Sequence, residues 1–335
     1  MDFISWAHMS QAIATLGFEV DLITDARKDL PHGPHGFRCV SFRGAKWSGY
    51  DGAIGFKQAG FQTLRKEAGR ALPPVVSLLT SVVGRTDDVP GVYFFGEARR
   101  RLYEAQQQIQ ATSQCVVMQT ESNRELWDQE FGGGDKVVMI PSATDRVIPP
   151  PGANPFGGFR EKIAIYIGHL YYREQRAVNL DWQHRLNRLG AALGRRRIRL
   201  FFLGPGYVDE IDDQAVTVLG RVPNERVWDY QYFADVGVVL AQGPVQRNES
   251  AKIYYYLRTG LPVVSEAPVP NNHVIQEANA GLIVEYGNED LLADAIHEVV
   301  HSKWDHEGAI RYILDHHTYE HRAPLFQRAI LSVTR

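Results

Sequence analysis

One short segment of the sequence, residues 248–265 (NESAKIYYYLRTGLPVVS), concentrates side chains that could do chemistry. Glu249, Lys252, Tyr255 and Tyr256 lie three and four residues apart, so a helix here would carry a carboxylate, an ammonium and two phenols on one face. That face is polar where the face of a buried helix should be apolar. The pattern therefore indicates a surface that binds a polar ligand.

The start of this helix is predicted to bind an anion. Asn248 or Ser250 can cap the helix, and Gly260 is placed to end it in a left-handed conformation. The helix follows the end of a predicted strand, so its free N–H groups could receive a diphosphate, with Lys252 as the partner for the negative charge. Ser250 and Lys252 are therefore candidate binding residues.

The elements around this segment repeat one pattern. Short apolar runs alternate twice with amphipathic stretches, which is typical of parallel strands joined by helices. In the first half, strands are predicted at residues 19–24, 51–56, 75–80, 115–119 and 137–140. In the second half, they are predicted at residues 162–168, 198–203, 216–219, 236–240, 261–265 and 282–285.

We predict two doubly wound α/β domains from this pattern. The N-terminal domain covers residues 1–148, and a linker rich in proline and glycine follows at 149–158. A second domain covers 159–316, and residues 317–335 form a helix that crosses back to the first domain. We predict that the first domain lacks its opening strand, since the sequence begins only a few residues before a predicted helix at 5–16.

Composition argues against several classes of protein. The 335 residues carry a formal net charge of −3, so no protein-wide positive field exists and nucleic acid is not an expected partner. Cys39 and Cys115 have no metal-ligand spacing, and we predict neither a disulfide framework nor a metal site. Without a signal-peptide pattern or a run of about 18 apolar residues, we expect a cytoplasmic protein. Basic clusters at 99–101 and 195–199 leave peripheral contact with the inner membrane face open.

The order of segments resembles that of the GT-B glycosyltransferases, especially glycosyltransferase family 4. Lys252, an aromatic run and then Gly-Leu-Pro-Val-Val at 260–264 are similar to the sugar-nucleotide signature of that family. Other segments that are similar, in the same order, are TLGFEVDLIT (15–24), MIPSATD (139–145), AIYIGHL (164–170), LFFLGPG (200–206), VTVLGRVPNERVWDYQYFADVGVVL (216–240), AGLIVEYGNEDLLADAI (280–296) and HHTYEHRAPLFQRAI (316–330). The resemblance implies a GT-B fold, in which two Rossmann-like domains face each other across a cleft.

The resemblance also implies a function. A sugar would pass from a nucleotide-sugar donor on the second domain to a glycan, lipid-linked or other glycoconjugate acceptor on the first, as in polysaccharide biosynthesis. The family retains anomeric configuration and needs no metal, so we expect no cofactor besides the donor. Glu249 and Lys252 are the implied catalytic residues. The implied donor-binding residues are Gly168, His169, Arg173, Gly220, Arg221, Val222, Ser250 and Tyr255.

Some positions depart from the family pattern. Tyr255 stands where the family usually has the carboxylate that holds the ribose, and Glu249 lies only near the place of the other carboxylate. His169 replaces the usual arginine after the opening strand of the donor domain, so Arg173 or Arg176 could substitute for it. Two alternatives stay open: a catalytically inactive relative that acts as a binding or scaffold protein, and a sugar-nucleotide epimerase.

Overall fold

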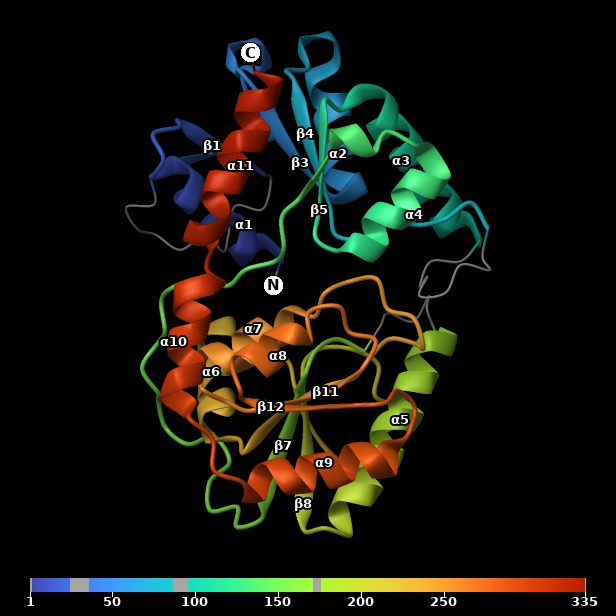
Figure 1. Ribbon diagram of the computed structural model, residues 1–335, viewed down its shortest axis with the longest axis vertical. Coiled ribbons are helices and arrows are strands. Elements are labelled where there is room, and N and C mark those ends of the chain that lie inside the picture. The colour runs from blue at the N-terminus through green and yellow to red at the C-terminus, as the bar shows by residue number, and fades with distance from the viewer. Residues whose placement is uncertain (1, 25–35, 87–95, 171–175, 335) are drawn as a thin grey trace. The chain divides into compact units, whose positions relative to one another are not determined.

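The computed structural model of the chain describes residues 2–24, 36–86, 96–170 and 176–334 (Figure 1). Its contacts divide the chain into two compact units. The first comprises Met1–Arg146, Arg247–Glu249 and His317–Arg335, and the second comprises Val147–Gln246 and Ser250–His316. The segment 149–158, predicted to be a linker, thus groups with the second unit, while three residues near the predicted site group with the first.

The first unit contains two parallel sheets. One has the strand order β3-β4-β5-β6, with strands β3 (Ala53–Phe56), β4 (Val75–Leu79), β5 (Cys115–Met118) and β6 (Val137–Met139). The other pairs β1 (Val20–Ile23), which was predicted at 19–24, with β2 (Phe37–Val40), which was not predicted. The first helix, α1 (Asp2–Ala14), leads into β1.

Helices cover both faces of the four-stranded sheet. Alternate residues of β4 point to opposite faces, so Val76 and Leu78 pack in one apolar cluster and Val75 and Leu79 in another. The first cluster includes side chains of α1 and of α11 (Tyr319–Val333), the helix close to the C-terminus. The second cluster includes α2 (Lys57–Ala68), α3 (Gly96–Thr112) and α4 (Glu121–Phe131).

The second unit is built on one six-stranded parallel sheet with the order β12-β11-β10-β7-β8-β9. Its strands are β7 (Lys162–Ile167), β8 (Ile198–Leu203), β9 (Val216–Gly220), β10 (Val236–Val239), β11 (Val263–Glu266) and β12 (Gly281–Val284). The chain moves outward from β7 to β9 and then returns to β10 on the other side of β7. This reversal is the topological switch point of a doubly wound sheet.

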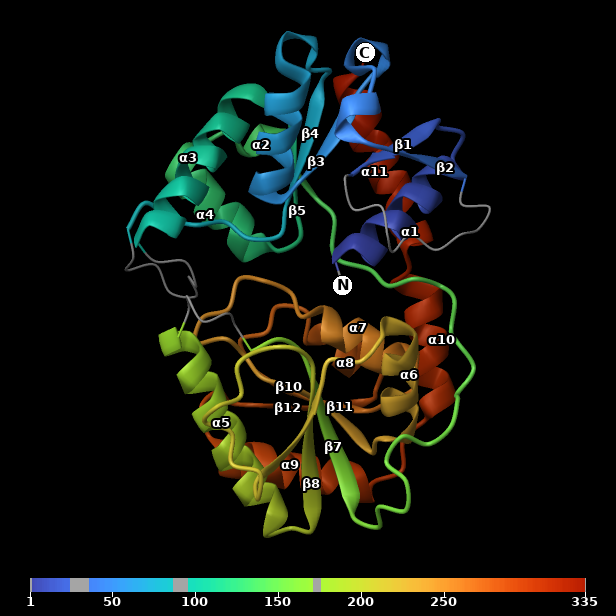
Figure 2. The ribbon, with the colours of Figure 1, turned by 180° about the vertical axis from the view of Figure 1, so that it is seen from behind.

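Two layers of helices enclose this sheet (Figure 2). One face packs on α5 (Arg176–Gly194) and α9 (Glu289–His301). The other face packs on α7 (Ala251–Arg258), α8 (His273–Glu277) and α10 (His306–His316), with α6 (Asn224–Phe233) beside them. The strands are continuous apolar runs because both of their faces are covered.

Candidate functional site

The switch point lies between β7 and β10, where their pairing is short. The two strands pair only at Val236 with Ala164 and at Gly237 with Ile165, so their carboxyl ends are not joined to each other by backbone hydrogen bonds. In open α/β sheets, ligands bind in the crevice outside the carboxyl ends at such a point. The loop after β7 and helix α7, which follows β10, are therefore the elements that can form a site here.

Glycines let the loops at this edge approach one another closely. The N–H of Gly168, directly after β7, donates to the carbonyl of Leu203 at 3.0 Å. Gly204 has a φ of +151°, and a Cβ atom there would lie 1.7 Å from the carbonyl oxygen of Gly168. The N–H of Gly204 in turn donates to the carbonyl of Gly220 at 2.9 Å. The backbones that follow β7, β8 and β9 thus touch directly, without intervening side chains.

Helix α7 is held against the end of β7 by Tyr256. The side chain of Tyr256 is fully buried, and its hydroxyl accepts the N–H of Ile167 at 2.9 Å. Burial raises the pKa of this phenol far above its ordinary range, so it stays protonated. Tyr256 was expected on the polar face with Lys252, and the structure corrects this, because the phenol packs in the core under the switch point.

Lys252 lies in the first turn of α7, below the loop after β7. Its Nζ lies 5.2 Å from the centre of the Tyr166 ring, and a Cβ at Gly168 would come within 3.2 Å of its Cε. The side chain is half-buried, and burial lowers its pKa from 10.5 to about 8. No carboxylate among the described residues forms an ion pair with this ammonium. Within the part of the chain that the structure describes, no anion therefore compensates this cation at the edge of the sheet.

The ends of α7 match the sequence prediction in part. Ser250 is the N-cap residue, but its side chain makes no capping hydrogen bond. Gly260 has a φ of +75°, so the left-handed ending is confirmed. Because α7 begins at Ala251, the helical spacing does not extend to Glu249, and the expected continuous stripe of four polar side chains is not formed.

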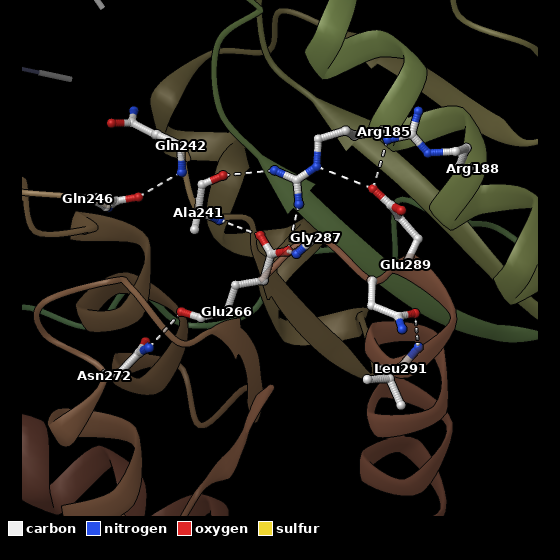
Figure 3. Close-up of polar contacts among 11 residues, drawn as sticks. Arg185, Arg188, Ala241, Gln242, Gln246, Glu266, Asn272, Gly287, Glu289 and Leu291 are labelled. Atoms are coloured by element: carbon white, nitrogen blue, oxygen red, sulfur yellow. Dashed lines mark hydrogen bonds and ion pairs between the residues drawn. The ribbon is translucent and has the colours of Figure 1, made fainter. Parts of the chain in front are cut away.

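A network of buried charges occupies the neighbouring part of the same edge (Figure 3). The Arg185 guanidinium on α5 donates to the Glu266 carboxylate at 2.6 Å, to the carbonyl of Ala241 at 2.9 Å and to Glu289 at 3.3 Å. Glu266, the last residue of β11, also accepts the N–H groups of Ala241 at 2.6 Å and Gly287 at 3.1 Å. Burial lowers the pKa of Arg185, but its anionic neighbours, Glu266 first, raise it above its usual value. The Arg185 guanidinium is thus compensated by two carboxylates and a carbonyl, and the Glu266 carboxylate by a cation and two N–H groups.

The chain is similar to known glycosyltransferases in both sequence and structure. Residues 161–302 match the family described as glycosyl transferases group 1. No curated protein matches the chain. HepE from Anabaena, solved in complex with UDP, superposes with a TM-score of 0.68 at 13% identity, over 97% of this chain and 96% of HepE. The chain has the GT-B fold.

Other solved GT-B structures give the same result. Sucrose-phosphate synthase from Thermosynechococcus elongatus has a TM-score of 0.64 at 14% identity, with 97% of this chain and 89% of that chain covered. WaaG, a glycosyltransferase involved in lipopolysaccharide biosynthesis, has a TM-score of 0.62 at 16% identity, with 98% and 95% covered. The fold predicted from the ordered segments is therefore confirmed, and the edge described above lies within residues 161–302, the part of the chain that matches the glycosyl transferases group 1 family model.

The remaining predicted residues lie in different parts of the GT-B fold. In the second unit, His169 and Arg221 are exposed, Gly220 ends β9, and Val222 packs partly against the core. Tyr255 is half-buried, with its ring 6.0 Å from that of Trp228. Arg173 lies outside the described residues.

Glu249 is described within the first unit. Its Oε2 accepts the N–H of Ser142 at 2.8 Å, so the carboxylate is held by the loop after β6. The neighbouring carbonyl of Arg247 accepts hydrogen bonds from Thr120 Oγ1 at 2.6 Å and from Asn123 Nδ2 at 3.2 Å. The three residues 247–249 are thus fixed by contacts with the start of α4 and the loop after β6.

The described residues bear on metal binding and on membrane crossing. Among the described residues, no group of three or more His, Cys, Asp and Glu side chains is placed to hold a metal ion. In the same ranges, no helix is long and apolar enough to cross a membrane. Metal independence and membrane contact stay predictions.

Sequence reasoning missed Arg185 and Glu266, which help to hold this site together, and it expected Tyr256 on a polar face instead of in the core. Tyr256, Arg185 and Glu266 each act on backbone groups of a distant segment, and residue spacing carries no signal for such contacts. Only Glu266 leaves a trace in the sequence, because a carboxylate directly after the apolar run of a buried strand needs a partner.

Proposed function

We propose that this protein is a glycosyltransferase that uses a nucleotide-sugar donor. The donor diphosphate binds at the carboxyl edge of the second-unit sheet, and the acceptor, a glycan or lipid-linked saccharide, binds to the first unit. Two findings support a nucleotide-sugar donor: residues 161–302 match the glycosyl transferases group 1 family model, and HepE, which has a similar fold, was solved in complex with UDP. The observation that carries the proposal is the Lys252 ammonium, which is half-buried at a helix start without a carboxylate partner among the described residues.

The chemistry places negative charge next to this ammonium. In the transfer, the bond between the sugar carbon and the diphosphate oxygen breaks and leaves its electron pair on that oxygen. A bond forms between the sugar carbon and the acceptor oxygen, and the acceptor hydroxyl proton is released to water. The diphosphate leaves with additional negative charge. Lys252 and the positive end of the α7 helix dipole stabilise that charge without a metal ion. We propose retention of anomeric configuration on the family resemblance.

The other predicted residues take supporting roles in this proposal. Gly168 and His169 border the diphosphate, and the loop of Gly220, Arg221 and Val222 takes the nucleobase. Ser250 begins the helix that faces the phosphates. Tyr255, half-buried beside Trp228, offers an aromatic surface and a hydroxyl to the nucleoside. Glu249 is proposed to contact the donor sugar.

One observation favours a second candidate, a binding protein of this fold without turnover. Tyr255 presents a neutral phenol where the family resemblance implies a carboxylate for the ribose. A donor would then be held with fewer charge-assisted hydrogen bonds. This candidate predicts nucleotide binding but no release of nucleoside diphosphate from any nucleotide sugar.

Calorimetric titration with UDP, GDP and ADP tests the proposal. At least one should bind the wild-type chain, and Lys252→Met should weaken that binding at least about 30-fold, the effect of losing a charge-assisted hydrogen bond of about 2 kcal/mol or more. Lys162→Met is the matched control, because the Lys162 ammonium is exposed and pairs with Asp235 at 2.8 Å at the opposite end of β7. Failure of all three to bind, or equal effects of the two substitutions, would overturn the assignment.

A turnover assay separates the two candidates. Release of nucleoside diphosphate from UDP-, GDP- or ADP-sugars is followed with mixed glycan acceptors. Release that depends on acceptor and is lost in Lys252→Met supports the transferase. Tight binding with no release under any combination supports the binding protein.

A further inference from the structure

The loop between β10 and α7, residues 241–250, is held at both ends by buried side chains. This loop leads directly into the first turn of α7, where Lys252 lies. Its ends are held by residues 266–271, a single short stretch that runs from the end of β11 to the start of α8.

Asn271 holds the end of the loop next to α7. Its Oδ1 accepts the N–H of Ser250 at 2.8 Å, and its Nδ2 donates to the carbonyl of Ser250 at 3.0 Å. The Asn271 side chain is 0% exposed, so neither hydrogen bond competes with water. One amide thus satisfies both backbone groups of the N-cap residue, whose own hydroxyl makes no capping bond. The orientation of the helix start depends on Asn271 instead of on Ser250.

The Arg185–Glu266 pair holds the other end of the loop. The Glu266 carboxylate accepts the N–H of Ala241, and the Arg185 guanidinium donates to the carbonyl of Ala241, as Figure 3 shows. Inside the loop, the Gln246 amide oxygen accepts the N–H of Gln242 at 2.9 Å. Ala241 and Ser250, the first and last residues of the loop, therefore each have their N–H and C=O groups hydrogen-bonded to buried side chains.

These grips matter because α7 is short. A helix of eight residues has little stability of its own, so its first turn would fray without external hydrogen bonds. Fraying would move Lys252 and disorder the N–H groups that point to the ligand. Fixing the N-cap before a ligand arrives removes that ordering cost from binding.

We propose that Asn271 is a positioning residue for the donor site, and that its amide fixes the start of α7 so that Lys252 and the first-turn N–H groups are preorganised for the diphosphate. The proposal rests on the function proposed above. Asn271 contacts no ligand in this arrangement and acts entirely through Ser250.

Asn272 supplies a matched control. It is the next residue, also an asparagine and 7% exposed, and its Nδ2 donates to the carbonyls of Glu266 at 2.7 Å and Ala267 at 3.2 Å. Asn271→Leu and Asn272→Leu therefore each remove two hydrogen bonds of a buried asparagine side chain in the same segment. Only the first removes the grip on Ser250.

The experiment has two arms on the full chain. Hydrogen–deuterium exchange without ligand should speed up at least about tenfold over residues 242–252 in Asn271→Leu and change less than threefold there in Asn272→Leu. Titration with whichever of UDP, GDP and ADP binds the wild type best should show an affinity loss of about 10- to 100-fold in Asn271→Leu, the range expected when a site is displaced by about 1 Å. Asn272→Leu should stay within threefold of the wild type.

Equal exchange rates over residues 242–252 in the two variants would refute the claim that Asn271 fixes the start of α7. Faster exchange in Asn271→Leu with unchanged nucleotide affinity would refute a role of Asn271 in binding. If no diphosphate binds the wild type, the proposed function fails and the binding role fails with it, while the exchange arm still decides the grip by itself. Asn271→Asp, which keeps the acceptor for the Ser250 N–H, should lie between wild type and Asn271→Leu in both arms and serves if Asn271→Leu does not fold.

Discussion

Replacing Lys252 by methionine should stabilise the protein while it removes diphosphate binding. The ammonium is half-buried, no carboxylate among the described residues pairs with it, and burial lowers its pKa from 10.5 to about 8. A charge in this position costs folding free energy, because part of its hydration is lost and no described carboxylate replaces it. Methionine has a similar length and fills the same space without the charge.

The expected gain in unfolding free energy follows from the pKa shift of Lys252. A shift from 10.5 to about 8 corresponds to an upper limit of about 3 kcal/mol. Partial exposure reduces this cost, and the contact with the Tyr166 ring offsets about 0.5–1 kcal/mol more. We therefore expect Lys252→Met to raise the unfolding free energy by about 1–2 kcal/mol, or the midpoint of the transition by about 2–8 °C.

The stability difference between Lys252→Met and the wild type should depend on pH. The pKa in the folded state is lower than in the unfolded state, so below pH 8 both states carry the proton and the full cost is present. As pH rises from 8 to 10.5, the folded state releases the proton first and the cost disappears. The difference between Lys252→Met and wild type should therefore be largest at pH 7 and vanish near pH 10.5.

Calorimetric unfolding without ligand and in a buffer free of phosphate measures this difference. Lys162→Met is the control, since its exposed ion pair with Asp235 should contribute no more than about 0.5 kcal/mol. A Lys252→Met protein that is less stable than wild type at pH 7 would refute the reasoning, because it would show that the ammonium is already compensated in the free protein.

Three further predictions concern the same edge of the sheet. Diphosphate affinity should fall about 20-fold between pH 7.5 and 9.5 as Lys252 loses its proton, and Lys252→Arg should flatten this profile in the same titration. Arg185→Met should cost about 3–5 kcal/mol in urea unfolding because it leaves the Glu266 carboxylate buried alone, whereas Arg195→Met, at an exposed pair, should cost less than about 0.5 kcal/mol. Gly204→Ala should destabilise by at least about 3 kcal/mol through its clash with a backbone carbonyl, whereas Gly194→Ala, with open space around it, should be neutral or slightly stabilising in thermal unfolding.

The sequence predicts most of the strands because each is an apolar run with both faces covered. All six strands of the second unit are found within about two residues of their expected positions. The strand at Phe37–Val40 was missed because it is short and only partly buried, so its pattern is mixed. The helices at His273–Glu277 and His306–His316 were missed as well; the first has only five residues and depends on packing against the rest of the unit.

The site is predictable only where one residue acts with its near neighbours. Lys252 could be singled out because a cation at a helix start after a strand is a local pattern. Asn271 could not, since its partner is 21 residues away and the contact exists only after the sheet has formed. Glu249 shows a different limit, because the helical spacing that seemed to include it ends where α7 begins at Ala251.

Arg185 and Lys252, two cations at one edge of the same sheet, differ in the anionic groups that the described residues place beside them. Arg185 is surrounded by Glu266, Glu289 and a carbonyl, so its charge is compensated and its removal should only destabilise. Lys252 sits over an aromatic ring at a helix start and is charged at a cost, with no ion-pair partner among the described residues. Folding alone gives no reason to keep such a charge, since methionine would serve the fold better. A ligand that brings negative charge to the switch point supplies the reason, and it turns the cost in the free protein into affinity for the donor.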